Sequence, residues 1–590
     1  MQLILLQFPF RSVSLALGLV AIMVFIYDIG YEDTSSFARE IPLFYFLLLN
    51  SFIFFNVVRL LTLDQQTSRR SQRVMVIFFT GVLLFTLSKV LFSVASLNQV
   101  VLQYLVVFRL CAVLFFVIEY SVVIERFYSL KMEPAFIFAI SFMLLIAIGT
   151  LLLMLPLANT KGISFVDALF TSTSAVCVTG LAVLDTGKDF TLVGQIIILS
   201  LIQAGGLGML TITSFFAYFF KQNLSYRETL FVKDFVSGNH IGNIFRLLVN
   251  IVTLTFAIEI LGAFFVFIFL PKEVFPEFGE RVYFAVFHSI SAFCNAGFST
   301  LTNGLYESVV RYEYTVHLII GFLIILGGFG YFILFNLADY IKERTLGFWK
   351  KNIVRSGKYR KRVRIVTLNS KIVIYTTLIL LIVGTVFFFF AEQENALKEH
   401  PTFWGKLVTS FFGSVTPRTA GFNTVDYNAL HIATIMITML LMWIGASPGS
   451  TGGGIKTSTF AIATLTIFST ARGKDKLEIS QRVVSNYSVR RAFAIINLSL
   501  IFIGFGVFFI SAFEPNGKAD FVRIAFECFS AYSTVGLSMS LTPILTDASK
   551  IVLVLLMFIG RVGAINLLIS ILTQIDTQHL NYPEEDILIN

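Results

Sequence analysis

The chain has 590 residues, of which 56% are hydrophobic and only 13% are charged. This composition, with a mean hydropathy of +0.83, excludes a soluble globular protein and indicates a polytopic membrane protein. The formal net charge of +9 is concentrated in loops between apolar segments. Membrane orientation explains this charge better than nucleic-acid binding does, and we expect no nucleic-acid partner.

Residues 1–130 are expected to form four N-terminal transmembrane helices, at about 12–30, 42–63, 74–96 and 99–124. Each segment is close to the ~20 residues that cross a bilayer. The first segment lacks a small-residue cleavage site and is therefore interpreted as a retained helix. Basic residues in the loop 64–74 place the amino terminus in the cytoplasm. Glu119 in the fourth segment is either a paired or interface-facing acid or a functional group.

From Pro134 onward, one pattern occurs four times: an apolar span, a short helix, a glycine strip and a second span. The central glycines are 117, 124 and 115 residues apart, and such regular spacing indicates an internal repeat. The predicted short helices are 163–175, 281–293, 402–414 and 519–531. The predicted pore repeats are 134–220, 246–341, 371–470 and 489–575, followed by a cytoplasmic tail at 576–590. With the N-terminal helices, this gives twelve spans and an all-α fold.

Loop charge supports the same topology. The loops between repeats are basic, most strongly at 342–371, whereas the segments beside the short helices are more acidic. By the positive-inside rule, the basic loops and both termini lie in the cytoplasm and the glycine strips lie near the outer side.

The glycine strips are predicted to line a pore, because extended backbone survives at membrane depth only when protein or a water-filled path surrounds it. Backbone carbonyls in such strips can replace the water around a monovalent cation, and glycine lets the backbone turn toward the axis. Four glycines favour potassium over sodium. The candidate ion-binding residues are Cys177, Val178, Thr179, Gly180, Cys294, Asn295, Ala296, Gly297, Arg418, Thr419, Ala420, Gly421, Ser533, Thr534, Val535 and Gly536.

The short helices and the strips carry further candidate features: the charge of the helix ends, two acids and two cysteines. The short helices direct their carboxyl ends, which carry partial negative charge, at the pore centre. Asp167 and Glu527 on these helices either fix a strip by a hydrogen bond or contact the ion. Cys177 and Cys294 are interpreted as small wall residues rather than reactive thiols. The spacing of the four cysteines fits neither a disulfide framework nor a zinc site.

Beneath the strips, a run of glycine with one proline interrupts the last span of repeat three and cannot continue a straight helix. It is predicted to be a gate, with a packed kink as the alternative. Lys456 either pairs with an acid or faces the cytoplasm. Arg561, inside the last span of repeat four, is predicted to be a pore barrier, with a structural clamp as the alternative. The gate residues are Gly445, Ser447, Pro448, Gly449, Ser450, Thr451, Gly452, Gly453, Gly454 and Lys456.

These motifs resemble the Trk/Ktr/HKT superfamily of potassium transporters, in particular the bacterial membrane subunits of Trk and Ktr systems, over about 134–575. The marks are Val178 to Leu181, Asn295 to Phe298, Arg418 to Phe422, Thr534 to Leu537, Ser447 to Lys456 and Gly560 to Gly563. The resemblance implies a pseudo-fourfold pore, a homodimer and potassium uptake at the bacterial inner membrane. It also implies that the glycine-rich break is an intramembrane gating loop and that Arg561 lies under the filter.

The resemblance further implies a cytoplasmic RCK-type regulatory subunit that binds NAD or ATP/ADP. The chain has no Gly-x-Gly-x-x-Gly motif after a predicted strand, so we expect it to bind no cofactor itself. The basic loop 342–371 is either a docking surface for that subunit or a contact with lipid headgroups. The four N-terminal helices exceed the eight-span core of the family.

Two other functions are the alternatives to potassium uptake. A sodium-permeable transporter, or a potassium symporter coupled to sodium or protons, would keep the same fold. A membrane enzyme or sensor would need clustered acids, histidines or a nucleophile at depth. The six histidines share no spacing and the acids Glu119 and Glu259 are isolated, so the chain is not expected to be an enzyme.

Overall fold

The computed structural model describes residues 2–31, 36–62, 77, 79–86, 88–89, 103–128, 134–208, 244–272, 275–352, 366–514 and 520–571. Nearly all of its regular structure is helical, as predicted. The described strands are β1 (Glu478–Ile479) and β2 (Arg482–Val483), which pair antiparallel with Glu478 opposite Val483.

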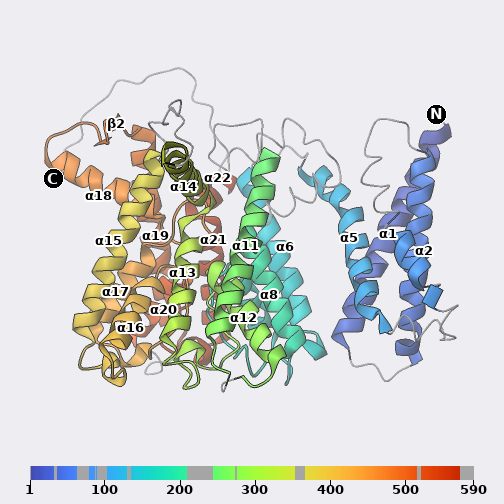
Figure 1. The fold of residues 1–590 in the computed structure, drawn as a ribbon, viewed down its shortest axis with the longest axis horizontal. Coiled ribbons are helices and arrows are strands. Elements are labelled where there is room, and N and C mark those ends of the chain that lie inside the picture. The colour runs from blue at the N-terminus through green and yellow to red at the C-terminus, as the bar shows by residue number, and fades with distance from the viewer. Residues whose placement is uncertain are drawn as a thin grey trace.

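The N-terminal helices form a separate bundle at one end of the long axis (Figure 1). Its described helices include α1 (Gln2–Gly30), α2 (Ser36–Thr62) and α5 (Leu105–Tyr128). Arg109 and Asp28 form an ion pair 2.8 Å long inside this bundle, and the Tyr45 hydroxyl donates to the same carboxylate at 2.8 Å. Three predicted features lie outside the described residues: most of the segment 74–96, the loop 64–74 and the side chain of Glu119.

After Pro134, each stretch of the chain contains a long apolar helix and a short one. The long helices are α6 (Pro134–Leu153), α11 (Ile244–Phe269), α15 (Leu368–Ala391) and α19 (Asn486–Phe513). These four are, among the described residues, the unbroken helices long and apolar enough to cross a bilayer. The short helices are α7 (Phe165–Val176), α12 (Phe278–Phe293), α16 (Phe403–Val415) and α20 (Phe521–Tyr532).

Each long helix holds its short helix through a glycine. A Cβ on Gly149, Gly262 or Gly384 would collide with the hydroxyl of Ser172, Ser289 or Ser414, respectively, on the short helix. These three serines also donate to backbone carbonyls of the long helix at 2.7–2.9 Å. In the fourth stretch, a Cβ on Gly506 would lie 3.4 Å from Cys528 Sγ. A serine hydroxyl therefore anchors the first three short helices, and in the fourth a thiol lies at the corresponding position in van der Waals contact with the glycine.

The helices that follow the strips close a cycle. They are α8 (Leu192–Leu207), α13 (Tyr314–Phe329), α17 (Ile432–Trp443) and α21 (Asp547–Val562). Each packs on the next short helix in turn: α8 on α12, α13 on α16, α17 on α20, and α21 back on α7. The four stretches therefore surround a common centre.

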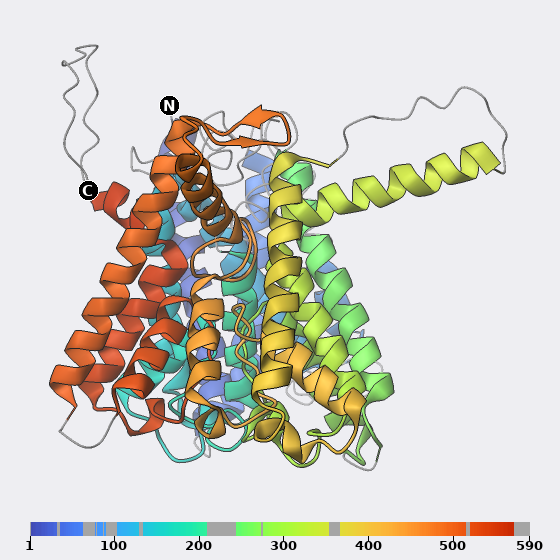
Figure 2. The ribbon, with the colours of Figure 1, turned by 90° about the vertical axis from the view of Figure 1, so that its left-hand side faces the viewer.

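These second helices are shorter than the sequence predicted. The second spans of the predicted repeats 246–341 and 489–575, expected as continuous helices near 315–340 and 549–574, are broken. The helices α13 and α21 end at Gly330 and Gly563, whose φ angles are +80° and +89°. A left-handed glycine ends an α-helix. Beyond Gly330, α14 (Tyr331–Asn352) turns by 103° and projects sideways from the helical body (Figure 2). Beyond Gly563 follows α22 (Ala564–Ile571). In the first repeat α8 ends at Gly208, and 209–220 lie outside the described residues.

The remaining helices flank the bundle. The third repeat continues after its break as α18 (Thr457–Ala471). In Figure 1, α12, α16 and α20 lie in the half of the bundle opposite α14, α18 and β2. Short 3-10 helices lie in the connections of the pore repeats: η1 (Pro156–Ala158), η3 (Gly304–Tyr306), η4 (Ala396–Glu399), η5 (Tyr427–Ala429) and η6 (Thr542–Ile544).

Candidate functional site

The four glycine strips share one unusual backbone conformation. The residue two positions before each central glycine has a positive φ, at Val178 (56°), Asn295 (60°), Thr419 (70°) and Thr534 (49°). The glycines themselves have φ between 68° and 93°. Non-glycine residues rarely adopt this conformation. Its recurrence at one position of every strip means that surrounding contacts impose the same backbone path four times.

The strips meet in a closed ring. A Cβ built on Gly180 would collide with the carbonyl oxygen of Ala296, and one on Gly297 would lie 2.6 Å from the carbonyl oxygen of Ala420. The series continues from Gly421 to Val535 and from Gly536 back to Thr179. Each glycine thus packs against the carbonyl that precedes the glycine of the next strip. Any side chain there would enter the ring.

Hydroxyl groups at the ends of the short helices hold the strips, and the sequence analysis missed them. The hydroxyls of Ser174 and Ser530 each accept a hydrogen bond, 3.1 Å long, from the amide of the strip glycine. In the other two strips, Ser291 and Thr416 donate to the carbonyl that follows the glycine, at 2.8 and 2.6 Å. The signal was present in the sequence, because a hydroxyl residue lies five or six positions before every central glycine.

The carboxyl ends of three short helices lie directly against the second helices. A Cβ on Gly205, Gly327 or Gly560 would collide with the last carbonyl of α7, α12 or α20, respectively. Each of these glycines begins a short glycine cluster that follows the central glycine of its repeat by 24 to 30 residues. The close approach keeps the partial negative charge of each helix end beside the ring.

In the third repeat, a loop takes the place of this contact. The loop, residues 444–456, lies between α17 and α18 and contains the residues predicted to form a gate; it is named the gating segment after that prediction. Cβ atoms on Gly452 and Gly453 would collide with the side-chain hydroxyls of Thr419 and Thr534. Thr451 and Ser447 are almost fully buried. The segment therefore lies immediately against two of the strips, as its sequence position suggested.

Hydrogen bonds from three other elements hold the gating segment. The Thr451 hydroxyl donates to the carbonyl of Phe293, the last residue of α12, at 3.3 Å. The Ser447 amide donates to Gly328 of α13 at 3.0 Å, and the carbonyl of Gly449 accepts from Tyr331 of α14 at 3.1 Å. The segment is therefore bonded on both sides of the break between α13 and α14.

Arg561 of α21 contacts the same segment from the fourth repeat. Its Nη1 donates to the carbonyl of Thr451, and its Nη2 donates to the carbonyl of Gly205 of α8 at 2.5 Å. One guanidinium thus ties the gating segment to the first repeat. This is the geometry of a clamp, which the sequence analysis kept as the alternative to a pore barrier. Lys456 pairs with a backbone carbonyl, that of Gly452 at 2.6 Å, rather than with an acid.

Two predicted site residues extend their side chains away from the ring. Cys294 Sγ lies 3.7 Å from Gln203 Oε1 and 3.8 Å from Glu259 Oε1, both on helices behind the second strip. Arg418 donates to Thr377 of α15, behind the third strip, at 3.4 Å. At these positions the thiol and the guanidinium therefore contact the surrounding helices α8, α11 and α15.

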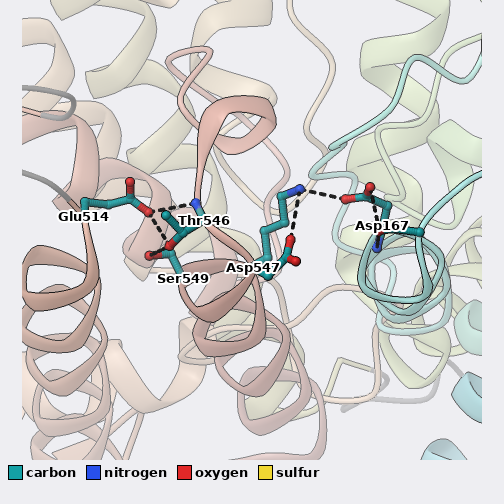
Figure 3. Close-up of polar contacts among 7 residues, drawn as sticks. Asp167, Glu514, Thr546, Asp547 and Ser549 are labelled. Carbon is teal, nitrogen blue, oxygen red and sulfur yellow. Dashed lines mark hydrogen bonds and ion pairs between the residues drawn. The ribbon is translucent and has the colours of Figure 1, made fainter.

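The two acids on short helices have different partners. Glu527 is fully buried and accepts hydrogen bonds from Ser538, Thr542 and the amide of Met539, all in the segment after the fourth strip. Asp167, by contrast, lies in the first turn of α7, remote from its strip. It forms an ion pair 2.7 Å long with Lys550 of α21 (Figure 3). That pair joins the fourth repeat to the first.

Outside the membrane-spanning helices, His400 is a buried titratable group. It follows η4 and contacts the Tyr314 hydroxyl at 3.0 Å and the Thr409 hydroxyl at 3.3 Å. Burial, aided by the positive charges of Arg311 and Lys406, lowers the pKa of His400 from 6.5 to about 4. This imidazole is therefore neutral near pH 7. No group of three or more His, Cys, Asp or Glu residues within the described ranges could hold a metal ion.

Comparisons with known proteins identify relatives of this chain. The family model described as cation transport protein, TrkH, matches residues 107–580. Ktr system potassium uptake protein B of Bacillus subtilis is 36% identical over 460 residues, covering 78% of this chain and 97% of the relative. The potassium/sodium uptake protein NtpJ of Enterococcus hirae is 35% identical over 468 residues, covering 78% and 98%.

A solved structure extends the likeness of the fold. The potassium transporter TrkH of Vibrio parahaemolyticus superposes with a TM-score of 0.56 at 16% identity, covering 91% of this chain and 97% of that one. The coverage exceeds what residues 131–590 can supply, so the shared fold extends into the N-terminal helices. The family model likewise includes α5. The chain belongs to the TrkH family of cation transport proteins, whose members are polytopic membrane transporters.

Proposed function

We propose that this chain takes up potassium across the plasma membrane, down its electrochemical gradient, through the ring of four strips. The carbonyls of Thr179, Ala296, Ala420 and Val535 replace part of the ion's hydration shell. The observation that supports this function is the cyclic packing of each strip glycine against the carbonyl of the next strip. The name of the Bacillus subtilis relative, a potassium uptake protein, favours potassium as the ion.

The gating segment closes the path beneath the ring in this proposal. Its contacts with Thr419 and Thr534 support that role, since the segment must move before an ion can leave the strips. Arg561 keeps it in place by donating to Thr451. The same guanidinium adds a positive charge below a cation filter, which limits flux when the segment moves aside.

The strips face outward and both termini lie in the cytoplasm, at what in bacteria is the inner membrane. The chain acts as a homodimer in the lipid bilayer and binds no cofactor itself. A cytoplasmic RCK-type subunit that binds NAD or ATP/ADP regulates the gating segment. The course of α14 supports a docking role, because this helix continues directly from the break beside the gating segment and carries exposed Lys342 and Arg344.

A sodium-permeable pore, or a potassium transporter coupled to sodium or protons, is the second candidate. It is favoured by one observation, the name of NtpJ as a potassium/sodium uptake protein. The two candidates differ in the ratio of potassium to sodium flux, and in whether a sodium or proton gradient drives potassium uptake.

The test is uptake of potassium and of sodium into liposomes that contain the purified chain, compared with Gly180→Ser. The added side chain would collide with the carbonyl of Ala296. We expect potassium flux to exceed sodium flux, and the ratio to fall about tenfold in the variant, because a displaced carbonyl no longer fits the ion. Gly162→Ser is the control, since Gly162 also has a positive φ but nothing within 4 Å of its Cβ.

Equal potassium and sodium flux would favour the second candidate. If neither ion moves, a cytoplasmic regulatory subunit is added. Flux that appears only then supports a gate opened by that partner, and continued absence of flux refutes the transport proposal.

A further inference from the structure

Arg418 is the exceptional residue among the four strips. Three positions before the central glycine, the other strips carry small side chains, Cys177, Cys294 and Ser533, whereas the third strip carries an arginine. The third strip is also one residue shorter, because Thr416 lies five positions before its glycine and Ser174, Ser291 and Ser530 lie six before theirs. The third strip therefore differs from the other three both in the side chain at this position and in its length.

The Arg418 side chain is buried almost without partners. It is 7% exposed, its Nη2 donates one long hydrogen bond of 3.4 Å to Thr377, and its Nε has no hydrogen-bond partner. Within the described ranges, no carboxylate forms an ion pair with it. An arginine at membrane depth is costly and is normally paired or hydrogen-bonded. Since no ion pair accounts for this buried charge, its presence needs another explanation.

Two features of the surroundings partly offset the cost of burying the Arg418 charge. A cavity of about 10 Å³ adjoins the side chain, which is room for roughly one water molecule. In addition, α16 ends at Val415, and the Arg418 amide donates to the Val415 carbonyl at 3.1 Å. Arg418 therefore follows the carboxyl end of α16 by three residues, and the partial negative charge of a helix end favours a nearby cation. The cavity is lined by Ile324, Gly328, Thr377, Leu381, Ala446 and Arg418.

The charge of Arg418 changes how strongly the ring of strips attracts a cation. In the other three strips, the carboxyl end of the short helix is beside small residues and remains available to attract a cation in the pore. In the third strip, the residue at this position carries a fixed positive charge, which opposes the partial negative charge of the helix end. A conducting filter must bind its ion weakly enough to release it.

We propose that Arg418 sets the cation affinity of the filter: its fixed positive charge behind the third strip weakens ion binding and thereby speeds ion release. Arg418 acts through the field at the ring and does not touch the ion. The inference rests on the proposed function, because it presupposes a cation in the ring.

The test measures potassium binding to the purified full chain by titration calorimetry, together with the concentration dependence of potassium flux in liposomes. For Arg418→Gln, which removes the charge, we expect about tenfold tighter potassium binding and a lower maximal flux, as one unit charge within the protein can produce. Arg418→Lys should retain the affinity of the unmodified chain.

Two variants at Thr377 test the charge even if Arg418→Gln does not fold. Thr377→Asp places a carboxylate beside the guanidinium and should tighten potassium binding, whereas Thr377→Val removes only the long hydrogen bond and should not. Unchanged or weaker binding in folded Arg418→Gln and in Thr377→Asp, with normal binding by the unmodified chain, would overturn the inference alone. Absence of potassium binding by the unmodified chain, with its regulatory partner present, would overturn the proposed function and this inference with it.

Discussion

Replacement of Arg561 by lysine separates the two roles of this residue. A lysine keeps the positive charge below the filter but cannot donate at the same time to Thr451 and Gly205 with the planar geometry of a guanidinium. If the charge alone limits flux, Arg561→Lys should behave like the unmodified chain. If the clamp limits flux, it should conduct faster.

The size of the effect follows from the bonds that hold the gating segment. A hydrogen bond from a charged group contributes roughly 1.5–3 kcal/mol, and Arg561 donates to both carbonyls. A lysine recovers one of the two bonds, so the held state loses about 2 kcal/mol. By the usual tenfold per ~1.4 kcal/mol, this shifts the equilibrium toward the open state about thirtyfold.

The assay is the initial rate of potassium uptake into liposomes for the unmodified chain, Arg561→Lys and Arg561→Gln. We expect both variants to conduct at least tenfold faster wherever the held state limits flux. Thr451→Ala is the matched control, because it removes only the weaker bond to Phe293 and keeps the carbonyl that Arg561 contacts. Unchanged flux in Arg561→Lys with raised flux in Arg561→Gln would refute the clamp and leave the charge as the barrier.

Three further predictions concern the ring, the closure of the repeats and the outer loops. Gly297→Ala should destabilise the chain by about 2–4 kcal/mol and lower potassium selectivity, because its Cβ would lie 2.6 Å from the Ala420 carbonyl at φ +68°; Gly162→Ala, with a positive φ and open space, should retain selectivity. Asp167→Asn leaves Lys550 buried without its closest partner and should cost roughly 3 kcal/mol in thermal unfolding, which Lys550→Met in the same chain should partly restore; no recovery would contradict the pairing. Because the pKa of His400 is lower in the folded chain than its ordinary 6.5, the unfolded chain binds the proton first, and stability should fall from pH 6.5 toward 4. In His400→Gln, that part of the acid sensitivity should be absent from unfolding curves.

Much of the site was predictable because its signals are local. The short helix predicted at 402–414 is α16, Phe403–Val415, since a Phe/Ser-rich run before a glycine strip defines both ends. The break in repeat three was also visible, because a proline and five glycines within 445–454 cannot continue a helix.

Other features depend on contacts that no local pattern encodes. Gly330 and Gly563 each lie within a long, largely apolar stretch, so the sequence suggested continuous spans where the backbone in fact turns. The partner of Asp167 is 383 residues away, and the two carbonyls that Arg561 contacts belong to different repeats. Their positions depend on the cyclic packing of the four repeats, which becomes evident only in three dimensions.

The most direct test of the account is a structure of the chain soaked with rubidium, with anomalous scattering used to locate the ion. Rubidium substitutes for potassium and scatters strongly. The account predicts a peak on the axis of the ring, among the carbonyls of Thr179, Ala296, Ala420 and Val535. An empty ring at rubidium concentrations that saturate uptake would contradict it.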